Sequence, residues 1–168
     1  MARGSRRVTT RCRIETPADE PFVRRVVTET IAEEFGAAAW PEPMRGSILG
    51  LQYDTRRSAA RAAGGDITSQ VIVADGEDVG WLLTSELPDQ IRIVEIAILP
   101  DWRGNGVGEA AIRGVLERGA RDGKPVRLVV TRTNARAIRL YERLGFTVSN
   151  ADEVQQEMEW TRAEREPQ

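Results

Sequence analysis

A glycine-rich turn late in the chain has the residue types that bind a phosphorylated group. Three glycines alternate with other residues directly behind Arg103, after an apolar stretch and before a helix-forming pattern. A helix N-terminus leaves backbone N–H groups unpaired at a positive dipole end, and glycines let those groups converge without side-chain interference. The arginine adds a cation at the same place. The stretch therefore predicts a pyrophosphate site made of Arg103, Gly104, Asn105, Gly106, Val107 and Gly108.

Two other interpretations of this turn are open. The glycines could serve only tight packing between a strand and a helix. The spacing Gly106-x-Gly108-x-x-Ala111 also matches the dinucleotide pattern of a Rossmann domain, which would indicate a nicotinamide-dependent oxidoreductase. That pattern normally follows the first strand of a βαβ repeat, whereas this turn comes late and follows an arginine.

A carboxylate in the apolar stretch before the turn is the second candidate. In the segment IRIVEIAIL (91–99), Glu95 and Arg92 are the only charged residues. In a strand covered on both faces an unpaired carboxylate is heavily penalised, and burial raises its pKa toward the range useful for a general base. The alternative is a structural ion pair with Arg92, Arg127 or another arginine of a strand.

Residue types that the chain lacks exclude several mechanisms. It has no histidine and one cysteine, which excludes Ser-His-Asp and Cys-His catalysis, intrachain disulfides and cysteine metal clusters. Acid–base chemistry must then use Glu, Asp, Tyr, Lys or water. We expect no metal, and we interpret Cys12 as a packed, unreactive thiol in the first strand.

Composition indicates one globular domain with no strong excess of positive or negative charge. The chain has 168 residues, 40% of them hydrophobic, and its 24 basic and 26 acidic residues give a net charge of −2. We expect no nucleic-acid partner, and the absence of signal-peptide and membrane-spanning patterns predicts a cytoplasmic protein without a membrane partner. We assign residues 11–162 to a single domain, 1–10 to a flexible basic arm and 163–168 to a flexible tail.

Hydrophobic periodicity predicts the elements that must position these groups. We expect a strand over 11–17, a β-hairpin over 68–86 that turns at Asp75-Gly76, a long strand over 90–100, a strand over 126–132, and one or two strands within 146–160. Helices are predicted over 18–36, 44–63, from the glycine turn to about 122, and over 134–145. This order indicates an α/β fold with a mixed sheet and helices on both faces.

Two segments resemble the signatures of one enzyme superfamily. Residues 103–108 resemble the R/Q-x-x-G-x-G/A motif of the GNAT superfamily of acyl-CoA-dependent N-acetyltransferases, and NARAIRLYERLGF (134–146) resembles its second signature. The strand order and the closing Met-Glu-Trp (158–160) are similar to small bacterial members. The resemblance implies a three-layer α-β-α fold with six or seven strands, splayed where acetyl-CoA binds.

The resemblance also implies which backbone binds the cofactor. The exposed backbone of Ile96, Ala97 and Ile98 would pair with the pantetheine amides, and an N–H at or near Ile98 would meet the oxyanion. A β-bulge is common in this strand. The turn at 103–108 would hold the pyrophosphate, and Asn134 would meet the pantetheine arm or the acyl end.

Two side chains would carry the chemistry. Tyr141 matches the superfamily tyrosine that stands near the sulfur as general acid, so it would contact the cofactor; its alternative role is a packed core tyrosine. Related proteins often place an acidic base on the strand before the turn, which favours Glu95 as the base, directly or through water. Glu86 and Asp89 are further candidates.

The implied activity is transfer of an acetyl group from acetyl-CoA to a primary amine by direct attack in a ternary complex. The alternative is a non-catalytic acyl-CoA-binding or regulatory module of the same fold. A small-molecule or peptide amine would enter over Ile31–Gly46, where Glu33, Glu34 and Glu42 could attract a cation and Trp40 could shield it. The same acids could equally be a solvated helix end. A homodimer is a further expectation from the superfamily.

Overall fold

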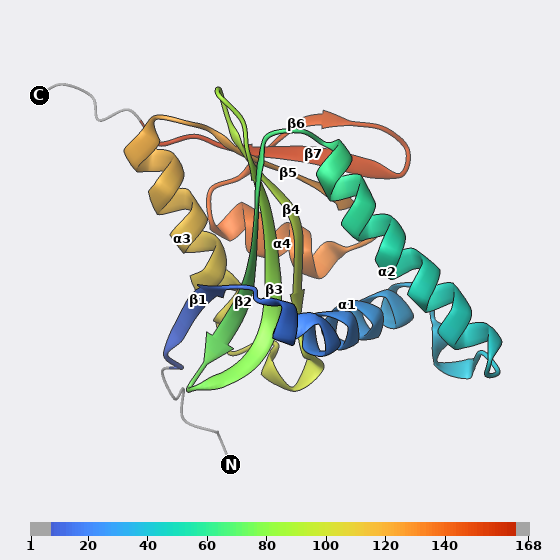
Figure 1. Ribbon diagram of the computed structural model, residues 1–168. Coiled ribbons are helices and arrows are strands. Elements are labelled where there is room, and N and C mark those ends of the chain that lie inside the picture. Colours follow the sequence, from blue (N-terminus) through green and yellow to red (C-terminus); the bar gives the residue numbers. More distant parts are fainter. Residues whose placement is uncertain (1–7, 164–168) are drawn as a thin grey trace, which may run out of the picture.

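One seven-stranded sheet organises the protein. The computed structural model describes residues 8–163, and the strands run in the order β1-β2-β3-β4-β5-β7-β6 (Figure 1). Every neighbouring pair is antiparallel except β4–β5, so the sheet is mixed and is not the parallel sheet of a Rossmann domain. The strands are β1 (Thr10–Ile14), β2 (Asp66–Ala74), β3 (Glu77–Glu86), β4 (Ile91–Ile98), β5 (Val126–Thr131), β6 (Thr147–Ala151) and β7 (Gln155–Trp160).

Helices cover both faces of this sheet. One buried cluster lies between the sheet and α1 and α2, and the other lies between the sheet and α3 and α4. The helices are α1 (Glu20–Glu34), α2 (Met44–Ala62), α3 (Val107–Asp122) and α4 (Ala135–Arg143). The predicted three-layer α-β-α architecture is confirmed, as Figure 1 shows.

Local sequence accounts for several of these boundaries. The buried positions of α1 follow helical spacing, with Val23, Val27 and Ile31 on one face. The β2–β3 hairpin turns at Asp75 and Gly76, whose φ angles of 49° and 88° suit a two-residue turn. Both features follow the prediction from the sequence.

The first strand starts earlier than expected. Thr10 pairs with Ala74 in β2, and the N–H of Asp75 donates to the carbonyl of Thr9 at 2.9 Å. Thr10, which the sequence assigned to the basic arm, therefore belongs to the sheet, and Thr9 is bound to the hairpin turn by this hydrogen bond. Residues 1–7 of that arm and 164–168 of the predicted tail lie outside the described residues.

The sheet diverges in its middle. β4 pairs with β5 over Ile91–Ile93 only, opposite Val126–Leu128, while the rest of β5 pairs with β7. From Val94 to Ile98 the edge of β4 that faces β5 has no strand partner among residues 8–163. This confirms the predicted splay.

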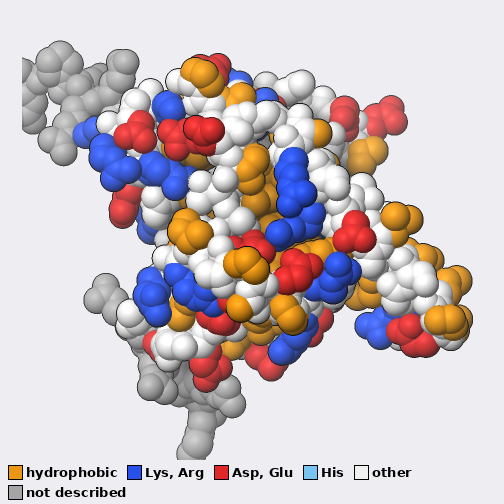
Figure 2. Space-filling model, in the orientation of Figure 1, with side chains coloured by type: hydrophobic (Ala, Val, Ile, Leu, Met, Phe, Trp, Pro, Cys, Tyr) orange, Lys and Arg blue, Asp and Glu red, His pale blue; other side chains and the backbone are white. Residues whose placement is uncertain are grey.

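The surface shown in Figure 2 carries basic and acidic side chains intermixed around a central strip of hydrophobic ones. No single sign of charge dominates that face. Within residues 8–163, none of the helices has an apolar stretch of the length that crossing a membrane takes.

Candidate active site

The β4–α3 connection gathers free backbone N–H groups. A 3-10 turn, η3 (Pro100–Trp102), follows β4, and Gly104 and Gly106 then adopt left-handed φ angles of 76° and 78°. Other residues would be strained there, so the backbone itself requires these glycines. The N–H groups of Val107 to Glu109, the first turn of α3, have no intrahelical acceptor and bond no other group of the described chain. The turn thus offers donors and a helix dipole to an anion.

Gly108 is different, because the fold itself does not require glycine there. Its φ is not left-handed, and an added Cβ would lie 3.8 Å from Cγ1 of Ile98 and 3.9 Å from Cδ2 of Leu140, which are ordinary contacts. The bare position therefore faces the region between β4 and α4. A ligand lying against this backbone would explain the absence of a side chain.

Arg103 turns its side chain back onto the protein. Nε donates to the carbonyl oxygen of Ile98 at 2.9 Å, and Nη1 forms an ion pair with Glu33 at the end of α1. Nη2 forms no hydrogen bond with residues 8–163. Arg103 thus ties the turn to β4 and α1, and one of its nitrogens remains for a phosphate.

The unpaired edge of β4 carries the backbone of Ile96, Ala97 and Ile98. On its other side β3 pairs closely with the same residues, with Gly80 opposite Ile98. A Cβ at Gly80 would lie 2.6 Å from the carbonyl oxygen of Ala97, so only glycine permits this approach. Gly80 was not predicted as a site residue, although a glycine inside a strand pattern signals a close backbone approach.

A β-bulge determines on which face of the sheet the side chain of Glu95 lies. The β3–β4 register shifts at Val94, which adds one residue to β4, as expected for this strand. Strict alternation from Ile93, which packs in the α3 cluster, would turn Glu95 toward α3. The extra residue reverses this direction, and Glu95 meets Arg56 of α2 instead.

Glu95 is largely buried, with a side chain that is 20% exposed, and it is ion-paired. Nη1 of Arg56 donates to Oε1 of Glu95 at 3.2 Å, and Nη2 of Arg56 donates to Oε2 of Glu34 at 2.5 Å. Burial raises the pKa of Glu95 to about 7; Arg56 lowers this pKa, and the charge of Glu34 raises it. The ion-pair interpretation is right in kind, but the partner comes from α2 rather than from Arg92 or Arg127. The pKa remains that of a group able to accept a proton near neutral pH.

Tyr141 lies in the cluster under α3 and α4. Its side chain is 8% exposed, and its ring packs on Phe146 with centroids 5.7 Å apart. Burial, and then the charge of Glu95, raises the pKa of Tyr141 to about 12. The phenol is therefore protonated at neutral pH, as a general acid must be. Its hydroxyl forms no hydrogen bond with other described residues, so the group is free to donate.

Asn134 caps α4. Its Oδ1 accepts a hydrogen bond from the N–H of Ala137 at 3.2 Å, and Gly145 beyond the helix end has a φ of 95°. Both caps follow the prediction. The amide nitrogen of Asn134 remains available to a ligand.

The predicted acceptor region is joined to this site by ion pairs. Glu33 binds Arg103, and the adjacent Glu34 binds Arg56. Both acids lie at the solvent-exposed end of α1, with side chains 51% and 44% exposed, and each one also holds an arginine that contacts β4. Sequence analysis missed Arg56, since nothing in its local pattern on α2 connects it to β4.

The other acidic candidates make contacts elsewhere. Glu86 pairs with Lys124 at 2.8 Å, and Glu42 accepts from the N–H of Gly46 at 3.2 Å. Asp89 precedes β4, where its charge acts on Arg127. None of these contacts leads to Glu95 or Tyr141.

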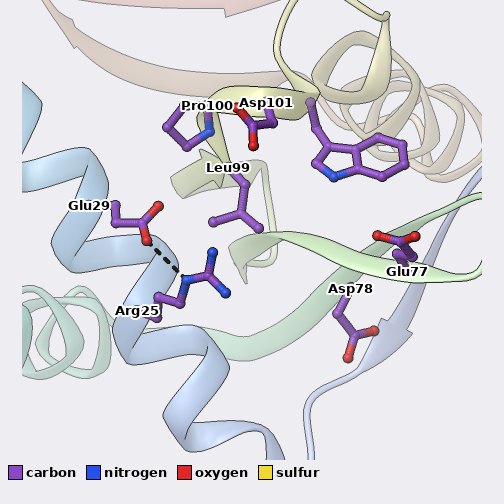
Figure 3. A pocket seen from close by; sticks show the side chains of 8 residues that line it. Arg25, Glu29, Glu77, Asp78, Leu99, Pro100 and Asp101 are labelled. Atoms are coloured by element: carbon purple, nitrogen blue, oxygen red, sulfur yellow. Dashed lines mark hydrogen bonds and ion pairs between the residues drawn. The ribbon is translucent and has the colours of Figure 1, made fainter.

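A cavity of about 360 Å³ lies beside this site rather than in it (Figure 3). Two of its acids already bind arginines: Glu29 pairs with Arg25 and Asp78 with Arg13, both at 2.9 Å. Its lining shares no residue with the predicted cofactor or catalytic set. It consists of Arg25, Glu29, Glu77, Asp78, Leu99, Pro100, Asp101 and Trp102. In the part of the chain that the structure describes, no three His, Cys, Asp or Glu side chains are grouped to hold a metal ion.

Two solved structures with a similar fold contain coenzyme A or acetyl-CoA. The PaiA N-acetyltransferase from Thermoplasma acidophilum, in complex with coenzyme A, aligns with a TM-score of 0.72 at 18% identity, over 92% of this chain and 99% of that one. YncA, a putative acetyltransferase from Salmonella typhimurium with acetyl-CoA, gives 0.61 at 17% identity, over 95% and 98%. These similarities establish the fold.

Sequence comparison extends the likeness to the family. The uncharacterized N-acetyltransferase MJ1207 from Methanocaldococcus jannaschii is 39% identical over 70 residues, which are 41% of this chain and 31% of that protein. The match thus spans about a third of the length of this relative. The model of the acetyltransferase (GNAT) family matches residues 27–146, from α1 to the end of the second signature. The chain belongs to the GNAT acetyltransferase family.

Proposed function

We propose that this protein transfers the acetyl group of acetyl-CoA to a primary amine in a ternary complex. The observation that carries the proposal is a convergence at one end of β4. The unpaired strand edge, the free N–H groups in the first turn of α3, and the side chains of Glu95 and Tyr141 all belong to this one region.

The backbone is suited to hold the cofactor. The edge at Ile96–Ile98 would bond the pantetheine amides as an added strand does, and the N–H groups of residues 107–109 would bond the diphosphate. The free Nη2 of Arg103 would add charge at the phosphates, and the amide of Asn134 would reach the pantetheine arm or the acyl end. Gly108 provides the close approach that the diphosphate needs.

Acetyl-CoA supplies an activated thioester carbonyl. The amine attacks this carbonyl carbon, so an N–C bond forms and the C–S bond breaks. Glu95 takes the proton that the amine nitrogen loses, directly or through water, and Tyr141 gives a proton to the departing sulfur. A backbone N–H at or near Ile98 would stabilise the oxyanion between these steps.

Amine-dependent release of CoA tests this function. Acetyl-CoA is incubated with the protein and a panel of primary amines, including a polyamine, a lysine-containing peptide and small amines, and free thiol is measured. Tyr141→Phe is expected to lower kcat about 100-fold, because acid catalysis contributes roughly 10²–10⁴. Its Kd for CoA should change less than about twofold, because the ring remains and only the hydroxyl is lost.

Tyr53→Phe is the matched control. Tyr53 is the other tyrosine of the chain, and it hydrogen-bonds Glu20 between α2 and α1. This variant should keep the wild-type kcat. Binding of acetyl-CoA without release by any amine would instead favour the non-catalytic module, and full turnover by Tyr141→Phe would remove this tyrosine as the acid.

A further inference from the structure

Arg56 stands between two carboxylates from different elements. It lies on α2, 39 positions from Glu95 on β4 and 22 from Glu34 on α1. Its guanidinium reaches Oε1 of Glu95 at 3.2 Å with one nitrogen and Oε2 of Glu34 at 2.5 Å with another. A planar fork is well suited to such a bridge, because its two donors have a fixed angle.

This bridge binds one carboxylate oxygen of Glu95 and leaves the other without a hydrogen bond from the described residues. Oε1 of Glu95 takes the bond from Arg56, whereas Oε2 accepts no hydrogen bond from residues 8–163. The side chains of Glu95 and Arg56 are 20% and 24% exposed, so solvent screens them little. The contact therefore fixes which oxygen of Glu95 is available to take a proton.

The two partners act on Glu95 in opposite directions. The titratable groups that face it are Arg56 from α2, Glu34 from α1 and Tyr141 from α4. Arg56 lowers the pKa of Glu95, and Glu34 raises it. Glu34 also shares the guanidinium, so its removal would leave Arg56 entirely to Glu95.

We propose that Arg56 is the positioning residue of the catalytic base: it orients Glu95 and, together with Glu34, balances its charge. This inference rests on the proposed function, in which Glu95 accepts the proton of the amine. Arg56 touches neither cofactor nor amine in this role, and it acts through Glu95 alone.

The test compares Arg56→Gln, Arg56→Lys and Glu34→Gln by two readouts. The first is the pH profile of kcat/KM for amine-dependent CoA release. The second is the carboxyl ¹³C chemical shift of Glu95 as a function of pH, assigned with Glu95→Gln. Arg61→Gln is the matched control, because Arg61 is an exposed arginine on the same helix.

Arg56→Gln and Glu34→Gln should shift the midpoint of the acidic limb, where kcat/KM rises with pH, in opposite directions. Arg56→Gln should move this midpoint up by about one pH unit, which lowers kcat/KM about tenfold at pH 6 and changes it little at pH 9. Glu34→Gln should move the limb down. Arg56→Lys should fall between wild type and Arg56→Gln, since it keeps the charge and loses the fork. Arg61→Gln should follow wild type.

The proposal would be overturned if the pH midpoints of Arg56→Gln and Glu34→Gln both equalled that of the wild type, or if both shifted in the same direction. If Arg56→Gln does not fold, Glu34→Gln decides the matter, because the side chain of Glu34 is 44% exposed and its loss leaves no buried gap. The carboxyl titration needs no turnover. Absence of CoA release with every amine would therefore refute the proposed function, while the titration of Glu95 would still support or overturn the role of Arg56.

Discussion

The proposed cofactor side and the proposed acceptor side of this site are built differently. On the cofactor side the groups are mostly backbone: the unpaired edge of β4 and the N–H groups that open α3, shaped by Gly104 and Gly106. On the acceptor side they are charged side chains brought together from α1, α2 and β4. A backbone site is defined by local conformation, whereas the side-chain site exists only when distant elements have packed.

Arg103 joins the two sides. Its contact with Ile98 belongs to the turn, and its contact with Glu33 belongs to α1, 70 positions away. Glu33 and Glu34 are adjacent, yet each one holds an arginine from a different side of the site. The last turn of α1 therefore contacts both sides.

The largest expected effect is on the cofactor side. Gly108→Asp places a carboxylate among the N–H groups of the turn, where it would repel a diphosphate. Two like charges about 4 Å apart at an effective dielectric of about 20 repel by about 4 kcal/mol, so we expect Kd for CoA to rise about 1000-fold. The melting temperature should not fall, because an acid in the first turn of a helix is favourable. Calorimetric titration and thermal melting measure the two effects.

Two controls sharpen this test. Gly114→Asp adds the same charge to α3 where a Cβ meets nothing within 4 Å, and it should leave Kd unchanged. Glu33→Gln removes the α1 support of Arg103, and because Glu33 is 51% exposed it should change Kd less than about threefold. A tenfold loss of affinity for CoA in Glu33→Gln would contradict the view that backbone groups provide most of the cofactor site.

The same difference explains what could be predicted from the sequence. The glycine turn, the caps at Asn134 and Gly145 and the hairpin at Asp75 depend on local residue types, whereas the splay of β4 was expected from the family resemblance. Arg56 could not be predicted, because α2 carries several arginines and only tertiary packing selects the one that reaches Glu95. The bulge at Val94 was expected only as a family trait, and it determines which helix Glu95 faces.

A smaller effect is expected from a substitution at Glu95, on the proposed acceptor side, and it concerns the free energy of unfolding rather than ligand binding. The pKa of Glu95 rises from 4.5 to about 7 on folding, so the folded state binds more protons than the unfolded state between these values. Stability of the wild type therefore falls as pH rises through this window. Glu95→Gln removes that dependence, and at pH 8 it should be more stable than wild type by about 3 kcal/mol, with little difference at pH 4.

Urea unfolding at the two pH values measures this difference. Glu117→Gln, at an exposed position of α3, is the matched control and should show no change with pH relative to wild type. A variant at Glu95 that is less stable than wild type at pH 8 would mean that the ion pair with Arg56 outweighs the cost of burying the charge.

The crystal structure of the complex with acetyl-CoA tests the central claim most directly. We expect the diphosphate on the N–H groups of Val107 to Glu109 and the pantetheine along the edge of β4 at Ile96–Ile98. A cofactor bound in the acidic cavity between α1 and β3, or anywhere else with this edge left free, would contradict it.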